Sequence, residues 1–68
     1  MYNRIMQLVF PLETTIRFKP INAFHNVYDQ IVVTGYRGTE DKGILECQAY
    51  RNGESELRLL HPADVIRA

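Results

Sequence analysis

The sequence predicts a small all-β domain, and three stretches carry that prediction. Residues Ile44 to Tyr50 and Glu54 to Leu59 both alternate between two kinds of side chain, with the period of two expected of half-buried strands. A dense run of β-branched residues between Gln30 and Tyr36 suits a central strand. We therefore expect antiparallel strands organised around a C-terminal hairpin.

The loop of that hairpin is residues 51–53, with the sequence Arg-Asn-Gly. An Asn-Gly pair favours a two-residue type I′ turn, but that register places Arg58 opposite Cys47, on the apolar face. A three-residue loop, with Gly53 as a left-handed bulge residue, instead gathers the apolar residues of both strands on one face. The pattern therefore predicts the three-residue loop, with Glu46 and Arg58 as a cross-strand ion pair outside.

The N-terminal part of the chain is predicted to supply two further strands. Residues Arg4 to Phe10 form the first, which Pro11 ends because proline lacks a backbone N–H for the ladder. Residues Thr14 to Phe18 alternate more cleanly and predict a short second strand. Residues 20–28 fit a short helix or an ordered loop, since apolar residues recur there at helical spacing among asparagines.

The remaining elements are a bend, a loop and a short C-terminal segment. Gly35 lies near the end of the β-branched strand and indicates a bulge or bend. A polar loop follows at residues 37–43. Pro62 and Asp64 suit one turn of 3-10 helix, because proline fits the first helical position and an acid is favoured near a helix N-terminus. Val65 to Arg67 then form a short last strand.

Length and charge limit the class of protein. The chain has 68 residues, which is enough for one domain, residues 1–68, but with a core so small that a partner or a second copy would add stability. Eight acidic and eight basic residues give a formal net charge of zero, so no global field attracts nucleic acid or an acidic membrane. Cys47 is the one cysteine, which excludes an internal disulfide. No stretch resembles a signal peptide or a membrane span, so we expect a cytoplasmic protein.

No set of residues points to catalysis or to metal binding. His25 and His61 are far apart in the chain and lack metal-ligand spacing, and His61 before a proline suits a turn. Glu40 and Asp41 adjoin in a loop that is expected to be solvated, whereas paired acids need burial to do acid/base work. We therefore expect no cofactor, no metal and no enzymatic activity, with an oligomeric small-barrel enzyme as the alternative.

The main functional signal is a Tyr-Arg pair at the end of each of two strands, Tyr36-Arg37 and Tyr50-Arg51. Tyrosine and arginine are enriched at protein interfaces, and they also stack on bases in single-stranded nucleic-acid sites. The zero net charge favours protein recognition, with RNA or single-stranded DNA as the alternative. The predicted binding face combines these pairs with polar positions of the hairpin: Tyr36, Arg37, Glu46, Gln48, Tyr50, Arg51, Glu56 and Arg58.

The order of the predicted elements resembles the SH3-like small barrels, including their Tudor, KOW and Sm-type relatives. The residues that carry this likeness are the strands at 30–36, 43–50 and 54–60, the turn at 61–64 and the strand at 65–67. The resemblance implies a five-stranded antiparallel barrel that binds a peptide or nucleic acid across its sheet or loops. One enzyme of this fold type, a plasmid-borne dihydrofolate reductase, has a Val-Gln-Ile-Tyr stretch that residues 56–59 do not match. We therefore expect a small non-catalytic regulatory, inhibitory or assembly protein, either alone or as a homo-oligomer.

Overall fold

The computed structural model describes residues 4–20, 27–38 and 42–68. In chain order the elements are helix α1 (Arg4–Val9), strands β1 (Thr15–Phe18), β2 (Gln30–Arg37), β3 (Ile44–Arg51) and β4 (Glu54–Leu60), the 3-10 turn η2 (Pro62–Asp64) and strand β5 (Val65–Arg67). All the strand pairs are antiparallel, which confirms the predicted all-β fold. The 3-10 turn predicted before the last strand is confirmed by η2. The helix or loop predicted at residues 20–28 falls mostly on residues 21–26, which lie outside the described residues.

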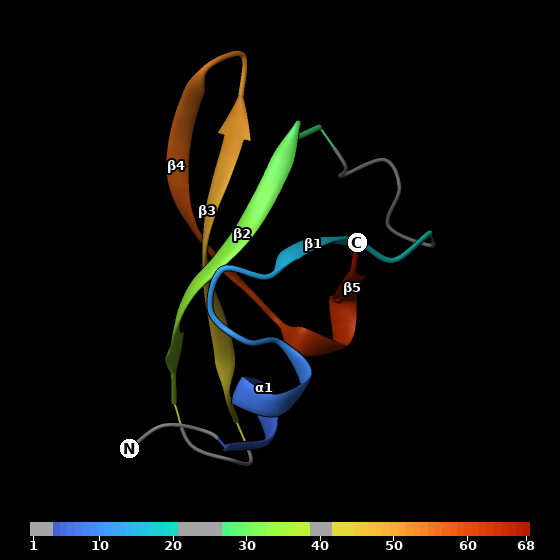
Figure 1. The fold of residues 1–68 in the computed structure, drawn as a ribbon, viewed down its shortest axis with the longest axis vertical. Helices are drawn as coiled ribbons and strands as arrows, with labels where there is room; N and C mark the ends of the chain where they lie inside the picture. The colour runs from blue at the N-terminus through green and yellow to red at the C-terminus, as the bar shows by residue number, and fades with distance from the viewer. Residues whose placement is uncertain (1–3, 21–26, 39–41) are drawn as a thin grey trace.

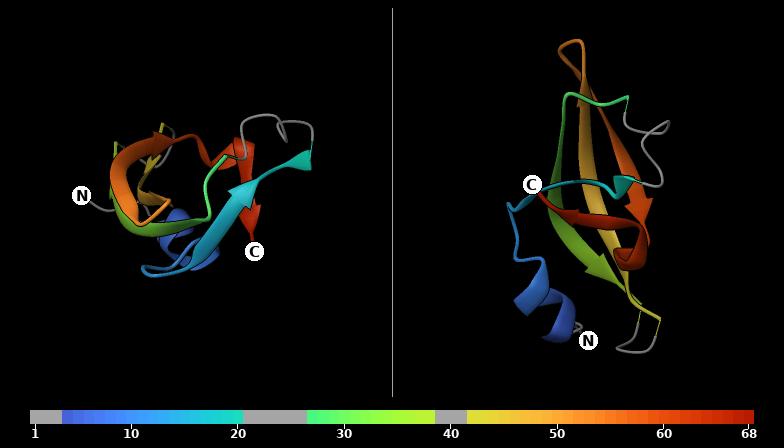
Figure 2. Two further views of the ribbon diagram at one scale, coloured as in Figure 1. Left: turned by 90° about the horizontal axis from the view of Figure 1, so that it is seen from above. Right: turned by 90° about the vertical axis from the view of Figure 1, so that its right-hand side faces the viewer.

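The five strands form one strongly curled sheet in the order β4-β3-β2-β1-β5. Strands β2, β3 and β4 run alongside one another (Figure 1), and β1 and β5 run crosswise to them (Figure 2, right). The turned views show that β1 and β5 lie on the concave side of this layer (Figure 2). The register of β2 shifts between Val33 and Gly35, which confirms the bulge predicted from the glycine. Within the described residues β4 and β5 are the two edges, so the sheet is open.

The hydrophobic core lies on the concave side of the sheet. In β3 the buried positions alternate as predicted, with Leu45, Cys47 and Ala49 at 0–1% exposure. The core residues are Met6, Phe10, Ile16, Phe18, Ile31, Val33, Leu45, Cys47, Ala49, Leu60 and Val65. Since Met6 and Phe10 belong to this set, the N-terminal segment packs on the concave side and leaves the convex side of β3 uncovered by the described residues.

The strand predicted for Arg4 to Phe10 is wrong, because this stretch forms helix α1. The backbone N–H of Phe10 donates to the carbonyl oxygen of Met6 at 2.7 Å, which closes a helical turn. A strand would place Met6, Leu8 and Phe10 on one face, whereas the helix buries Met6 and Phe10 and leaves Leu8 79% exposed. The burial of two residues one turn apart therefore decides the conformation.

The prediction of a three-residue hairpin loop is also wrong, because the structure has a two-residue loop. Strand β3 pairs with β4 so that Arg51 opposes Glu54 and Cys47 opposes Arg58. Asn52 and Gly53 have φ angles of 53° and 82°, which is the left-handed conformation that a type I′ turn requires at both central positions. The Asn-Gly signal for this turn therefore prevails over the apolar pattern of the strands.

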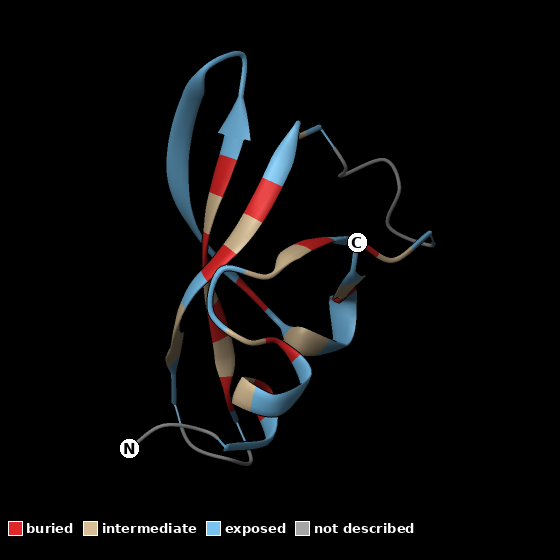
Figure 3. Cartoon of the chain, viewed as in Figure 1, coloured by how far each residue is buried: buried red, intermediate tan, exposed pale blue. Residues whose placement is uncertain are grey.

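The physical reason is that little of the molecule packs on β4. Every residue of β4 except Leu60 is exposed, as Figure 3 shows along the length of the strand. The predicted register assumed that one face of β4 is buried, so that charges would have to point away from it. Because solvent reaches both faces of β4, charged side chains can lie on the concave side at little cost, and the turn sets the register.

Candidate functional site

The observed register sorts the side chains of the hairpin onto two faces. Directly opposed residues of antiparallel strands point to the same side of a sheet. Glu56 and Arg58 oppose the buried residues Ala49 and Cys47, so both charged residues lie on the concave side. The alternate positions lie on the convex side. We call these positions the hairpin face, and its members are Glu46, Gln48, Tyr50, Ser55, Leu57 and Leu59.

The hairpin face exposes large apolar side chains. Tyr50 is 40% exposed, Leu57 is 52% exposed and Leu59 is 49% exposed. Gln48 opposes Leu57, and Glu46 opposes Leu59, so each leucine has a polar neighbour on β3. An aromatic ring and two leucines interspersed with polar groups form the kind of exposed patch that a protein interface covers.

Polar contacts hold the other side chains of the hairpin face in place. The guanidinium of Arg37 on β2 forms an ion pair with the carboxylate of Glu46. The Nε2 atom of Gln48 donates to the hydroxyl of Ser55 at 3.2 Å. The predicted ion pair between Glu46 and Arg58 is wrong, because these residues lie on opposite faces. Since the Arg37–Glu46 pair is partly exposed, it contributes about 0.2–1 kcal/mol and acts mainly to orient the two side chains.

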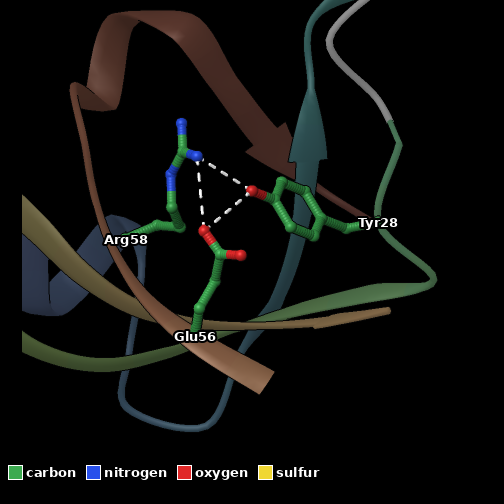
Figure 4. Close-up of polar contacts among 3 residues, drawn as sticks. All are labelled: Tyr28, Glu56 and Arg58. Atoms are coloured by element: carbon green, nitrogen blue, oxygen red, sulfur yellow. Dashed lines mark hydrogen bonds and ion pairs between the residues drawn. The ribbon is translucent and has the colours of Figure 1, made fainter. Parts of the chain in front are cut away.

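The concave side of the hairpin carries a polar cluster of three residues (Figure 4). The Nη1 atom of Arg58 donates to the hydroxyl of Tyr28 at 2.9 Å and lies 3.5 Å from the Oε2 atom of Glu56. The hydroxyl of Tyr28 donates to that same carboxylate at 3.3 Å, and the guanidinium lies 5.7 Å from the centre of the tyrosine ring. These contacts satisfy the charges that the turn places on the concave side.

The two Tyr-Arg pairs lie at opposite ends of the sheet and differ in their surroundings. Tyr36 packs against the core, its hydroxyl donates to the carbonyl oxygen of Phe10 at 2.6 Å, and burial raises its pKa. Tyr50 pairs with Gln30 at the other end of β2, and its ring is exposed on the hairpin face. Of the two tyrosines, Tyr50 is therefore the one available to a partner.

The predicted binding face is divided by the structure. Glu46, Gln48 and Tyr50 lie together on the hairpin face, with Arg37 beside them. Arg51 lies next to the loop, where it opposes Glu54. Glu56 and Arg58 lie on the concave side, and Tyr36 packs against the core. Leu57 and Leu59 were not among the predicted site residues, because the three-residue loop would place them inside; the Asn-Gly pair was the signal for the register that exposes them.

Cys47 and His61 both contribute to the fold, one in the core and the other in a turn. Cys47 is completely buried, and burial together with the charge of Glu46 raises the pKa of its thiol to about 11. The thiol is therefore protonated at neutral pH, which is unfavourable for a nucleophile. The Nδ1 atom of His61 accepts a hydrogen bond from the backbone N–H of Ala63 at 3.1 Å and caps η2, as predicted for a turn residue.

A second exposed apolar surface follows helix α1 and the residue after Pro11. Ile5, Leu8, Val9 and Leu12 are 63%, 79%, 46% and 57% exposed. Their spacing of three and four residues is the signature of one helix face, and this was the signal that the strand prediction for Arg4 to Phe10 overlooked.

A groove of about 420 Å³ lies beside this second surface, lined by Gln7, Pro11, Leu12, Thr34, Gly35 and Tyr36. The hydroxyl of Thr34 donates to the carbonyl oxygen of Glu46 at 3.2 Å, and that of Tyr36 to Phe10. Both hydroxyls are therefore engaged in hydrogen bonds within the fold.

Comparison with known proteins adds no relative. No family model, no curated protein and no solved structure matches this chain. Within residues 4–20, 27–38 and 42–68, no three histidine, cysteine or acidic side chains gather as a metal site. No helix among the described residues has the length and apolar character needed to cross a membrane.

Proposed function

We propose that this chain is a non-catalytic protein-binding module and that its binding surface is the hairpin face. The observation that carries the proposal is the exposure of Tyr50, Leu57 and Leu59 together on the convex side of β3 and β4. Completing the burial of two half-exposed leucines contributes roughly 1 kcal/mol for each. Tyrosine adds a large contact area at low entropic cost, which makes Tyr50 the expected hot spot.

The arrangement of the strands supports this proposal by resemblance. The sheet order β4-β3-β2-β1-β5 with η2 before β5 is similar to that of SH3-like small barrels. Members of that group bind peptides or nucleic acids across a sheet face or loops. Within that group of functions we propose a regulatory, inhibitory or assembly role.

Two observations favour a protein over RNA or single-stranded DNA as the partner. The formal net charge is zero, whereas nucleic-acid sites gather cations that neutralise phosphates. Tyr36 and Tyr50 lie at opposite ends of the β2–β3 pairing, so the two Tyr-Arg pairs do not form one stacking platform. A protein that presents both apolar and polar groups is therefore the better match to the hairpin face.

The test is affinity capture from extract of the native cells, with quantification of bound protein by mass spectrometry. Tyr50→Ser and Leu59→Ser should each reduce the recovered partner at least tenfold. Leu8→Ser is the matched control, since it removes an exposed leucine from α1, and it should retain the partner. Equal recovery by all baits would contradict the proposal. Recovery of nucleic acid that is lost at raised salt would support the nucleic-acid alternative instead.

A further inference from the structure

The free edge of β4 has a pattern that is complementary to itself. Among the described strands β4 forms one edge of the sheet, pairs with β3 through its whole length and has no bulge in that pairing. Its sequence Glu-Ser-Glu-Leu-Arg-Leu-Leu contains no proline or lysine, but it carries charges on the concave side at Glu56 and Arg58, so a strand that pairs with this edge must match those charges. The edge is therefore able to accept another strand.

The two-residue loop determines which backbone groups this edge presents. In such a hairpin the residues that flank the loop, Arg51 and Glu54, form a hydrogen-bonded pair, and hydrogen-bonded and non-hydrogen-bonded pairs then alternate. Glu54, Glu56 and Arg58 consequently direct their backbone N–H and C=O groups toward β3. Ser55 and the two leucines Leu57 and Leu59 direct theirs away from β3, to the free edge.

We propose that β4 pairs with β4 of a second copy in antiparallel orientation, about a two-fold axis at Leu57. Leu57 then opposes Leu57 of the second copy, and Ser55 opposes Leu59. Each of these residues exchanges backbone hydrogen bonds from the groups that point to the edge. Glu56 opposes Arg58 of the second copy, and Arg58 opposes Glu56, so each such pair has opposite charges.

Charge selects this register over its neighbours. Moving the axis to Glu56 opposes the two Glu56 carboxylates, and moving it to Arg58 opposes the two guanidinium groups. Like charges directly opposed across strands are destabilising. An axis between two residues would bring the leucines of one copy onto the charged side of the other. Only the axis at Leu57 gives opposite charges on the concave side and apolar contact on the convex side.

The resulting dimer has a single sheet that continues through both copies. On its convex side the two hairpin faces adjoin, with the leucines of both copies in one row. Tyr50 lies on β3, one strand away from the edge. Tyr50→Ser should therefore remain dimeric even where it loses the proposed partner.

Charge reversal tests the register through mass measured by analytical ultracentrifugation. The wild-type chain should dimerise with rising concentration, and Glu56→Arg and Arg58→Glu should each weaken dimerisation at least tenfold. An equimolar mixture of these two variants should form a heterodimer, because each opposed pair again has opposite charges. The control Arg17→Glu, an exposed residue of β1, should dimerise like wild type.

Cysteine cross-linking tests the axis without altering charge. Directly opposed residues of a hydrogen-bonded pair have Cα atoms about 5.5 Å apart, within reach of a disulfide. Leu57→Cys should therefore form a covalent dimer under mild oxidation. Ser55→Cys should not, since its copies would be separated by four residues of strand, roughly 13 Å. Wild-type chain that stays monomeric at millimolar concentration would overturn the proposal, as would equal cross-linking of both variants or a dimer that is indifferent to Glu56→Arg.

Discussion

The contact between Tyr28 and Arg58 gives a quantitative test of the hairpin register. Only the two-residue loop places Arg58 on the concave side, where its Nη1 atom lies 2.9 Å from the hydroxyl of Tyr28. A hydrogen bond to a charged group contributes about 1.5–3 kcal/mol when shielded. The side chain of Arg58 is 44% exposed, so solvent screening reduces the expected coupling to about 0.5–1 kcal/mol.

A double-mutant cycle measures that coupling. Tyr28→Phe removes the hydroxyl and keeps the ring, Arg58→Ala removes the guanidinium, and urea unfolding of the single and double variants gives the interaction free energy. A second cycle with Glu46→Ala and Arg58→Ala should give no coupling beyond about 0.3 kcal/mol, because those side chains lie on opposite faces. Coupling between Glu46 and Arg58 without coupling between Tyr28 and Arg58 would show that Arg58 lies on the convex side and that the loop has three residues.

Three further outcomes follow from the core, the turns and the N-terminal helix. Burial raises the pKa of Cys47 from 9.0 to about 11, so folding favours the protonated thiol; the stabilisation is complete below pH 9 and is lost as the pH rises toward 11. In urea unfolding, the free energy of unfolding of the wild type should therefore fall by up to about 3 kcal/mol more than that of Cys47→Ala over that pH range. Equal decreases for the two proteins would contradict this prediction. Gly53→Ala should cost about 1–2 kcal/mol in thermal unfolding, since φ is 82° but no atom lies within 4 Å of the added Cβ. Gly38→Ala should cost more, since its Cβ would lie 2.5 Å from a backbone carbonyl oxygen, and the reverse order would be unexpected. Met6→Ala should destabilise by about 2–5 kcal/mol while Leu8→Ala stays within about 0.5 kcal/mol, because Met6 is 4% and Leu8 79% exposed; similar effects at both positions would argue against helix α1.

Most strands could be predicted because their signals are local. The β-branched run of β2, the alternation of β3 and the proline of η2 each act over a few residues and do not depend on the rest of the chain. The bulge at Gly35 was predictable for the same reason, since an isolated glycine in a strand often marks one. These elements agree between sequence and structure.

The failures concern segments in which packing covers only part of the surface. In α1 just one side of the helix packs on the core, and Ile5 and Leu8 remain exposed, so the apolar residues fitted a strand and a helix alike. In β4 solvent reaches both faces, so the apolar pattern did not report which face points inward. Tyr28, whose hydroxyl accepts a hydrogen bond from Arg58, lies thirty residues away from it in sequence. No local pattern indicates that contact.

The candidate site was predictable in part for the same reason. Glu46, Gln48 and Tyr50 were placed correctly because β3 packs over the core and its alternation is enforced. Glu56 and Arg58 were placed on the wrong face because they depend on the register of β4. The same register error placed Leu57 and Leu59 inside, whereas they are exposed on the convex side.

The register of β3 against β4 underlies both the hairpin face and the proposed dimer edge, and proton NMR measures it directly. In an antiparallel pair, the close contacts between Hα atoms occur at non-hydrogen-bonded pairs. The two-residue loop predicts nuclear Overhauser effects between the Hα atoms of Gln48 and Leu57 and between those of Glu46 and Leu59. Hα contacts of Gln48 with Glu56, or of Cys47 with Leu57, would contradict the account.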